Sequence, residues 1–226
     1  MARLKWDETG ERLYETGTRN CVLYNLGESG TYDTGVAWNG LTAVTESPSG
    51  AEKTGIYADD IKYGELISAE EFGGTIEAYT YPKEFEKCDG SAELAAGVTI
   101  GQQKREKFGL CYRTIVGNDV KNEDYGYKLH LVYGATASPS EKAYASVNDS
   151  PEAITFSWEF TTTPVNVTDN KPTSVIIIDS TKADPTKLRS LEDILYGTDP
   201  VGGSGAGTEP RLPMPDEIAT LFEESE

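Results

Sequence analysis

The chain has 226 residues, of which 37% are hydrophobic, and its aromatic residues include 13 Tyr and 3 Trp. This content is too high for a disordered chain and is enough for one sizeable β domain with appendages or for two small domains. The formal net charge of −18 argues against a protein that grips nucleic acid, because binding phosphates requires clustered Lys and Arg. The acidity suits either simple solubility or a surface that repels nucleic acid.

The N-terminal segment is polar and punctuated by glycine. Residues 1–20, with Trp6 as an isolated apolar anchor, are predicted to form an arm that docks on another surface. Residues 21–26 follow as a first strand. Residues 36–44 form a stronger strand candidate, in which Gly40 marks a possible β-bulge.

A long polar segment comes next, residues 45–60, and the sequence Ser-Pro-Ser-Gly at 47–50 is expected at its tip. Connections of this length in a compact domain are usually functional or disordered. Residues 61–72 are ambiguous, and a strand is favoured over a helix because Gly73 and Gly74 would stop a helix at once. Residues 75–81 are a firmer strand.

The clearest β signal lies in residues 127–164. From residue 154 to residue 160, large apolar and polar side chains alternate, which is typical of a strand with one buried and one solvated face. Residues 128–133 form its expected partner, and residues 143–147 a possible third short strand. With the alternating run at 105–116, this antiparallel pattern predicts a mainly β fold.

The C-terminal part combines one more strand with two helices. The apolar run in residues 174–180 suits a strand covered on both faces. Asp184 and Pro185 are typical of a helix start, and Gly197 of its end. A glycine-rich linker precedes a short terminal helix at 216–222, which must dock on its own domain or on a neighbour. The predicted organisation is an arm (1–20), a β domain (21–200), a linker (201–208) and a docking segment (209–226).

The inventory of reactive side chains predicts neither an enzyme nor a metal or cofactor site. His130 is the single histidine and sits on the polar side of its strand, without a neighbouring nucleophile. Cys21, Cys88 and Cys111 lack metal-ligand spacing and are expected to be buried thiols. Asp59 and Asp60 resemble half of a calcium loop without the rest of its spacing. No phosphate-binding loop or nucleophile-elbow motif occurs, and no apolar run of about 18 residues predicts membrane insertion.

Several segments, in order along nearly the whole chain, resemble the major tail protein (tail tube protein) family of long non-contractile-tailed bacteriophages. They are Lys-Trp-Asp-Glu-Thr-Gly at 5–10, Gly-Val-Ala-Trp-Asn-Gly-Leu at 35–41, Glu-Ser-Pro-Ser-Gly-Ala-Glu at 46–52, Thr-Ile-Glu-Ala-Tyr-Thr-Tyr-Pro at 75–82, Gly-Tyr-Lys-Leu-His-Leu-Val-Tyr-Gly at 126–134, Asp-Ser-Pro-Glu-Ala-Ile-Thr-Phe-Ser-Trp at 149–158, Leu-Glu-Asp-Ile-Leu-Tyr-Gly-Thr at 191–198 and Pro-Met-Pro-Asp-Glu at 213–217.

The resemblance implies an antiparallel β-sandwich or barrel that forms hexameric rings in a virion. Such rings stack into a hollow tail tube that encloses the tape-measure protein, meets tail terminator and distal tail proteins, and later conducts DNA without binding it specifically. Polar strand faces are then candidates for the bore: Thr75, Glu77, Thr155, Ser157 and Glu159. The candidate contacts between subunits and rings are Trp6, Pro48, Ser49, Gly50, Tyr57, Ile218, Leu221 and Phe222. For each polar strand face, simple exposure to bulk solvent remains the alternative.

Two other functions are compatible with the sequence. A monomeric β-sandwich could bind carbohydrate or a protein ligand, and Tyr57, Tyr63, Tyr79 and Tyr81 are available to stack on sugars. A glycosidase would need a pair of carboxylates, for which Glu71 with Glu77 or Glu159 are candidates, although 38 acidic residues make such pairs common by chance.

Overall fold

The computed structural model describes residues 3–147, 149, 152–200 and 207–223. Its strands are β1 (Leu13–Asn25), β2 (Val36–Ala37), β3 (Leu41–Glu46), β4 (Ser49–Gly50), β5 (Lys53–Ala58), β6 (Ile61–Ile67), β7 (Glu70–Glu71), β8 (Gly73–Ala78), β9 (Ala92–Ala95), β10 (Val98–Ile100), β11 (Phe108–Asn118), β12 (Asn122–Ala137), β13 (Phe156–Thr162) and β14 (Val175–Asp179). The helices are the short 3₁₀ turn η1 (Lys83–Phe85) with α1 (Glu86–Asp89), then α2 (Pro185–Tyr196) and α3 (Pro215–Phe222). The prediction of a mainly β, antiparallel fold is confirmed.

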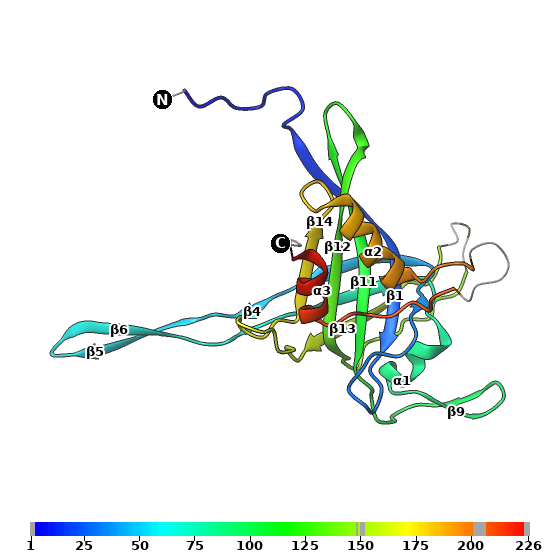
Figure 1. Ribbon diagram of the computed structural model, residues 1–226. Helices are drawn as coiled ribbons and strands as arrows, with labels where there is room; N and C mark the ends of the chain where they lie inside the picture. Colours follow the sequence, from blue (N-terminus) through cyan, green and yellow to red (C-terminus); the bar gives the residue numbers. More distant parts are fainter. Residues whose placement is uncertain (1–2, 148, 150–151, 201–206, 224–226) are drawn as a thin grey trace.

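One antiparallel sheet in the order β2-β1-β11-β12-β13-β8-β3 forms the body (Figure 1). The long strand β12 changes partner along its length: Lys128–Val132 pair with β14, and Ala135–Ala137 pair with β13. The predicted pairing of residues 128–133 with residues 154–160 is therefore wrong, because residues 128–132 pair with β14 and β13 pairs with residues 135–137. This exchange splits the sheet into two layers, as in a β-sandwich.

Two apolar clusters lie on opposite faces of β1, β11 and β12. One face packs against β3, β8 and β13, where Phe108, Leu110 and Val132 join Ile76 and other side chains. The other face is covered by α2 and α3 (Figure 1) through Leu129, Leu131 and Tyr133. The alternation of side chains along β11 and β12 places successive residues in different cores, except at Gly134, where the backbone has a positive φ and the alternation is interrupted.

Trp158 lies at the centre of the first cluster and is fully buried. Its ring meets Phe85 at 5.1 Å, Tyr81 at 5.4 Å and Trp38 at 5.8 Å between centroids, each in an edge-on arrangement. Such geometry matches the quadrupoles of aromatic rings and adds to the gain from burial. The predicted alternation in β13 is thus confirmed from Phe156 onward.

Residues 47–72 form an extended two-stranded projection, which we call the hairpin arm (Figure 1, cyan, at left). Its turn is made by Asp59 and Asp60, both with positive φ (50° and 60°), as a two-residue hairpin turn requires. The expectation that residues 47–50 form the tip was therefore wrong, because Ser49 and Gly50 pair with Glu70 and Glu71 at the base. Asp59 and Asp60 suit this turn because aspartate tolerates the left-handed backbone conformation that the turn requires.

Four other expectations need correction. Residues 13–20 are part of β1 rather than of an arm, so the N-terminal arm comprises residues 3–12 in the described chain. Residues 143–147 form no strand. Gly40 is a turn residue (φ 76°) that separates β2 from β3 instead of a bulge within one strand. Ile177 is 50% exposed, so β14 is not covered on both faces.

The C-terminal helices follow the predicted pattern. Asp184 caps α2 through bonds from Thr186 N (2.9 Å) and Lys187 N (3.0 Å) to its carboxylate. The linker residues 201–206 lie outside the described residues, and the residues on either side meet through mutual backbone bonds between Thr198 and Thr208. The terminal helix was predicted to dock on its own domain or on a neighbour. It docks on its own domain, because Ile218 is buried in the second apolar cluster, which also contains side chains of α2.

Candidate assembly surfaces and a polar sheet face

The strands β8 and β13 present a polar surface on the side of the sheet opposite to Trp158. In the register of this pair, Glu77 lies beside Ser157 and Thr75 beside Glu159. Because these residues alternate with Ile76, Trp158 and other core residues, all four predicted side chains share one outward face. Thr155 is exposed, but it precedes β13 and is not part of the ladder.

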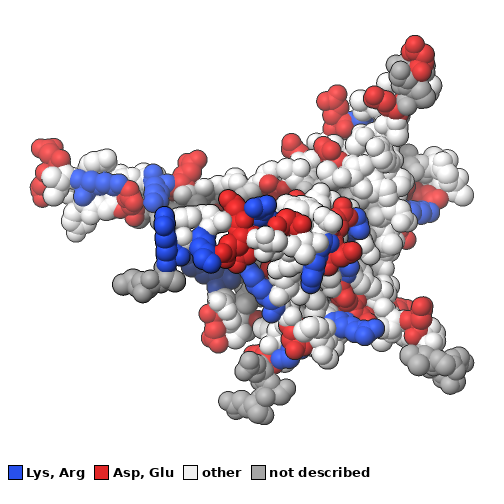
Figure 2. Space-filling view, turned by 90° about the horizontal axis from the view of Figure 1, so that it is seen from above, with Lys and Arg blue, Asp and Glu red and all other residues white. Residues whose placement is uncertain are grey.

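The strand β3 extends this face with Ala43 beside Glu77 and Thr45 beside Thr75. None of the residues that these registers place on the face is Lys or Arg. A surface with two carboxylates, several hydroxyls and no cation stays hydrated and repels polyanions. On the face of the molecule that is seen from above, acidic and basic side chains are interspersed (Figure 2).

The outer part of the hairpin arm, β5 with β6, leaves its large apolar side chains in water. These residues are between 39% and 76% exposed: Ile56, Tyr57, Ile61, Tyr63, Leu66 and Ile67. Within these two strands, residues other than Gly55 and Gly64 are classed as exposed. Ile56 and Leu66 share one face of the ribbon, and Tyr57 lies on the other. Neither face of this hairpin is covered by the body.

The N-terminal arm has a similar character. Trp6 is 74% exposed. The root of the arm is fastened to the turn between β11 and β12, because Gly10 N donates to Asp119 (3.0 Å) and Asn118 donates to Gly10 O (3.0 Å). The arm therefore leaves the body from a defined point with its apolar side chain free.

The other predicted contact residues fall into two groups. Pro48, Ser49 and Gly50 are exposed at the base of the hairpin arm, and Tyr57 is exposed near its end. Ile218, by contrast, is only 6% exposed, and Leu221 and Phe222 pack partly against the same cluster. Their first role is thus inside the subunit, because α3 has an apolar stripe that needs cover.

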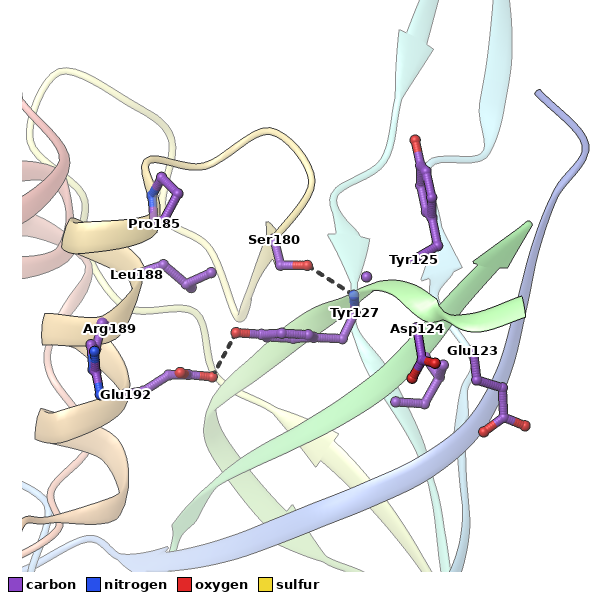
Figure 3. Close-up of a pocket in the computed structure, with 11 residues that line it drawn as sticks. Glu123, Asp124, Tyr125, Tyr127, Ser180, Pro185, Leu188, Arg189 and Glu192 are labelled. Atoms are coloured by element: carbon purple, nitrogen blue, oxygen red, sulfur yellow. Dashed lines mark hydrogen bonds between the residues drawn. The ribbon is translucent and has the colours of Figure 1, made fainter. Parts of the chain in front are cut away.

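A shallow pocket of about 470 Å³ lies between α2 and the start of β12 (Figure 3). Within it, Tyr127 donates its hydroxyl hydrogen to Glu192 (2.9 Å), and Ser180 Oγ accepts from Tyr127 N (2.8 Å). Burial, followed by the bond to Glu192, raises the pKa of Tyr127 to about 12. These contacts join β12 to α2 and to the residue that follows β14.

His130 was expected on a polar strand face, and the structure buries it to 7% exposure among polar side chains. Its Nδ1 lies 3.0 Å from Glu46 Oε1, and its Nε2 lies 3.0 Å from Thr114 Oγ1. The bond with His130, together with that from Tyr112, holds the pKa of Glu46 below its usual value despite partial burial. The alternation of β12 indicated the orientation of His130, but only the tertiary structure brings Glu46 above it.

The three cysteines are buried free thiols, as predicted. Burial raises the pKa of Cys88 and Cys111 to about 12, so neither sulfur is an available nucleophile. In the described part of the chain, no group of three potential ligands is arranged to hold a metal ion.

The tyrosines considered for carbohydrate binding do not gather on one surface. Tyr57 and Tyr63 lie on the hairpin arm, Tyr79 is exposed just after β8, and Tyr81 packs among the rings of Phe85, Phe156 and Trp158. A stacking platform needs neighbouring aromatic faces, and these four residues do not supply one.

Comparisons with known proteins do not assign the chain to a family: neither the family models nor the curated proteins contain a match. Within the described residues, no helix is long and apolar enough to cross a membrane.

Proposed function

We propose that this protein is a structural subunit that assembles with copies of itself into a tube, as the resemblance to phage tail tube proteins implies. In this proposal, hexameric rings stack into the tail tube of a virion, enclose a tape-measure protein and conduct DNA. The single observation that carries the proposal is the hairpin arm, which exposes apolar side chains on both faces at a distance from its own body.

An isolated two-stranded hairpin is marginally stable in water. At about 3.3 Å per residue, the strand from residue 46 to residue 58 reaches up to roughly 40 Å. A projection of this length with exposed Ile56, Leu66 and Tyr57 gains free energy by lying on another molecule, at roughly 25 cal/mol for each Å² of apolar surface buried. A second copy of the chain is the partner that is always present during assembly.

The sheet edges support the same proposal. Among the described residues, β3 pairs only with β8, and β14 pairs only with β12, so each has a backbone edge available. Open edges are a hazard for a monomer, and a closed ring removes them by pairing each edge with the next copy.

The polar sheet face fits the inside of such a tube. Thr75, Glu77, Ser157 and Glu159 would line a hydrated bore whose carboxylates repel phosphates. DNA would then pass without sticking, since binding requires cations to replace the counterions of the phosphates.

Electron microscopy of the negatively stained protein at several concentrations tests the proposal. Stacked rings or hollow tubes are expected. Small monodisperse particles at every concentration, with or without a tape-measure protein added, would overturn it.

A shortened hairpin arm makes this test specific. Glu52 and Ser68 already face each other, because Ser68 N donates to Glu52 O (3.0 Å). Replacing residues 53–67 by Asn-Gly therefore closes a short hairpin without disturbing β4 and β7. We expect this variant to fold but to form no tubes, and deletion of residues 1–10 to do the same. Lys53→Gln, which leaves the apolar side chains in place, is the control that keeps assembling.

A further inference from the structure

The roots of both arms meet at one polar cluster, in which the imidazole of His130 is buried and its partners are partly exposed. Glu46 is the last residue of β3, just before the hairpin arm, and Glu15 lies on β1, shortly after the N-terminal arm. The imidazole of His130, on β12, lies between these two carboxylates, with Nδ1 3.0 Å from Glu46 and Nε2 3.8 Å from Glu15. The cluster is thus the point where the body can fix one arm relative to the other.

Every polar group around the imidazole makes a bond within the cluster. From β11, Tyr112 donates to Glu46 Oε1 (2.5 Å), and Thr114 donates to Glu15 Oε1 (2.5 Å). From β12, Lys128 donates to the other oxygen of Glu15 (2.6 Å). The ring of Tyr112 also stacks on the imidazole, with centroids 4.7 Å apart and planes 10° from parallel.

Counting the hydrogens that these contacts need bears on the charge of the imidazole. A threonine hydroxyl has one hydrogen, and Thr114 gives it to Glu15. Its oxygen can therefore only accept from His130 Nε2, which lies 3.0 Å away. Glu46, an ionised carboxylate, can only accept from Nδ1. If both contacts are hydrogen bonds, both ring nitrogens donate, and an imidazole with two N–H groups is the protonated form.

A neutral imidazole leaves the cluster incomplete in one of two ways. Either one ring nitrogen faces an acceptor without a hydrogen, or Thr114 turns to Nε2 and abandons Glu15. A protonated Glu15 would restore the count, but Lys128 opposes this. Burial of the Glu15 carboxyl raises its pKa, and the bonds from Lys128 and Thr114 outweigh that effect, so its pKa lies below the usual value.

We propose that His130 is held as an imidazolium and that its proton ties the roots of the two arms together. With it, Glu15 and Glu46 are balanced by Lys128 and His130. Without it, the cluster carries one uncompensated negative charge beside the buried imidazole, and solvent screens that charge only in part because both carboxylates are partly covered. This link between the two roots, which we call the tie, belongs to the single subunit. Any effect of the tie on how the arms are presented for tube assembly rests on the proposed function.

The sign of the pH dependence follows from the groups involved. The carboxylates have lowered pKa values in the folded chain, so their contribution is lost as the pH falls through those values. The tie also needs the proton on the imidazole ring, so its contribution is absent when His130 is neutral. The tie therefore holds the two roots together within a range of pH. Protonation of the carboxylates ends this range on the acid side, and loss of the imidazole proton ends it on the basic side.

Because His130 is the single histidine, ¹⁵N NMR of tag-free protein reports on this ring alone. At about pH 7, where an unperturbed imidazole is mostly neutral, we expect both ring nitrogens to show the protonated signature. A single neutral tautomer at that pH would overturn the proposal. In the Glu46→Gln variant, which keeps an acceptor but removes the charge, the imidazolium fraction is expected to fall severalfold.

Amide hydrogen exchange at the arm root tests the mechanical consequence. Ser47 N is bonded to Gly73 O (2.8 Å) beside Glu46. Its protection factor, corrected for the intrinsic pH dependence of exchange, is expected to fall at least about tenfold between about pH 6 and about pH 9 in the unassembled chain. In His130→Gln the factor should be low and independent of pH. Glu93→Gln, which breaks the distant Lys83–Glu93 pair, should behave as wild type.

A protection factor of Ser47 that stays constant in wild type, or that changes equally without His130, would overturn the tie. These measurements use the subunit alone, so a failure to form tubes would count against the proposed function and leave the proton assignment intact.

Discussion

Trp158 and Trp6 show how differently the body and the arms of this molecule use the same side chain. Trp158 is fully buried among aromatic rings, whereas Trp6 is 74% exposed on an arm. The body satisfies its apolar residues internally through two clusters on opposite faces of one sheet. The arms present theirs outward. The difference teaches that stability depends on the body, whereas the proposed assembly depends on the arms, so substitutions should affect one without the other.

The largest expected effect on stability comes from the centre of the body. Trp158→Ala removes a ring that contacts Phe85, Tyr81 and Trp38 and leaves a cavity, so we expect a loss of about 3–5 kcal/mol in the free energy of unfolding. Denaturant titration measures it. Tyr144→Ala, at a side chain 75% exposed, is the control and should change little. A loss below about 1 kcal/mol for Trp158→Ala would contradict the assignment of the core.

The next effect is at the junction between body and hairpin arm. A Cβ on Gly74 would lie 2.3 Å from Thr45 O, a backbone atom that cannot move aside easily. Gly74→Ala is expected to cost about 1–3 kcal/mol through overpacking between β3 and β8. Gly101→Ala meets nothing within 4 Å and serves as the control. Equal thermal stability of the two variants would contradict this prediction, because it would mean that β3 and β8 move apart to accept the extra Cβ without loss of stability.

A smaller effect is expected at the start of α2. Asp184→Ala removes the bonds that Thr186 N and Lys187 N make to the cap, so a loss of about 1 kcal/mol is expected. Asp193→Ala removes the same charge from an exposed site within the helix and should cost less. If both substitutions cost the same in urea unfolding, the effect would be one of charge rather than of capping.

The smallest effect on stability, with the largest effect on assembly, belongs to the hairpin arm. The double substitution Ile56→Ser with Leu66→Ser should change the free energy of unfolding by no more than about 0.5 kcal/mol, because both side chains are exposed. Tube formation, scored by electron microscopy, should be lost. Tubes of normal length, or a subunit that fails to fold, would break the separation between body and arms.

The alternation of residue types determined much of the secondary structure and the direction of side chains. The runs in β11, β12 and β13 assign Leu110, Leu131 and Trp158 to buried faces, and the Asp184-Pro185 pair marks the start of α2. These features follow from local geometry, since successive side chains in a strand point to opposite faces and a cap is read from adjacent residues.

Part of the candidate site could also be predicted from alternation. Thr75, Glu77, Ser157 and Glu159 were each placed on polar faces, and the register of β8 with β13 shows that these faces are one surface. The sequence also contained a signal that was missed: Asp59 and Asp60 form a two-residue turn between runs rich in Ile and Tyr, which is typical of a hairpin.

Only the tertiary structure decided which distant residues meet. β12 exchanges partners between β14 and β13, and Glu15, Glu46 and His130 come together from three strands. The tertiary structure also decided that Ile218 packs against α2 and is buried, whereas Ile56 and Tyr57 stay exposed. The physical reason is that side-chain direction depends on the local backbone, whereas burial depends on what other segments bring to each face.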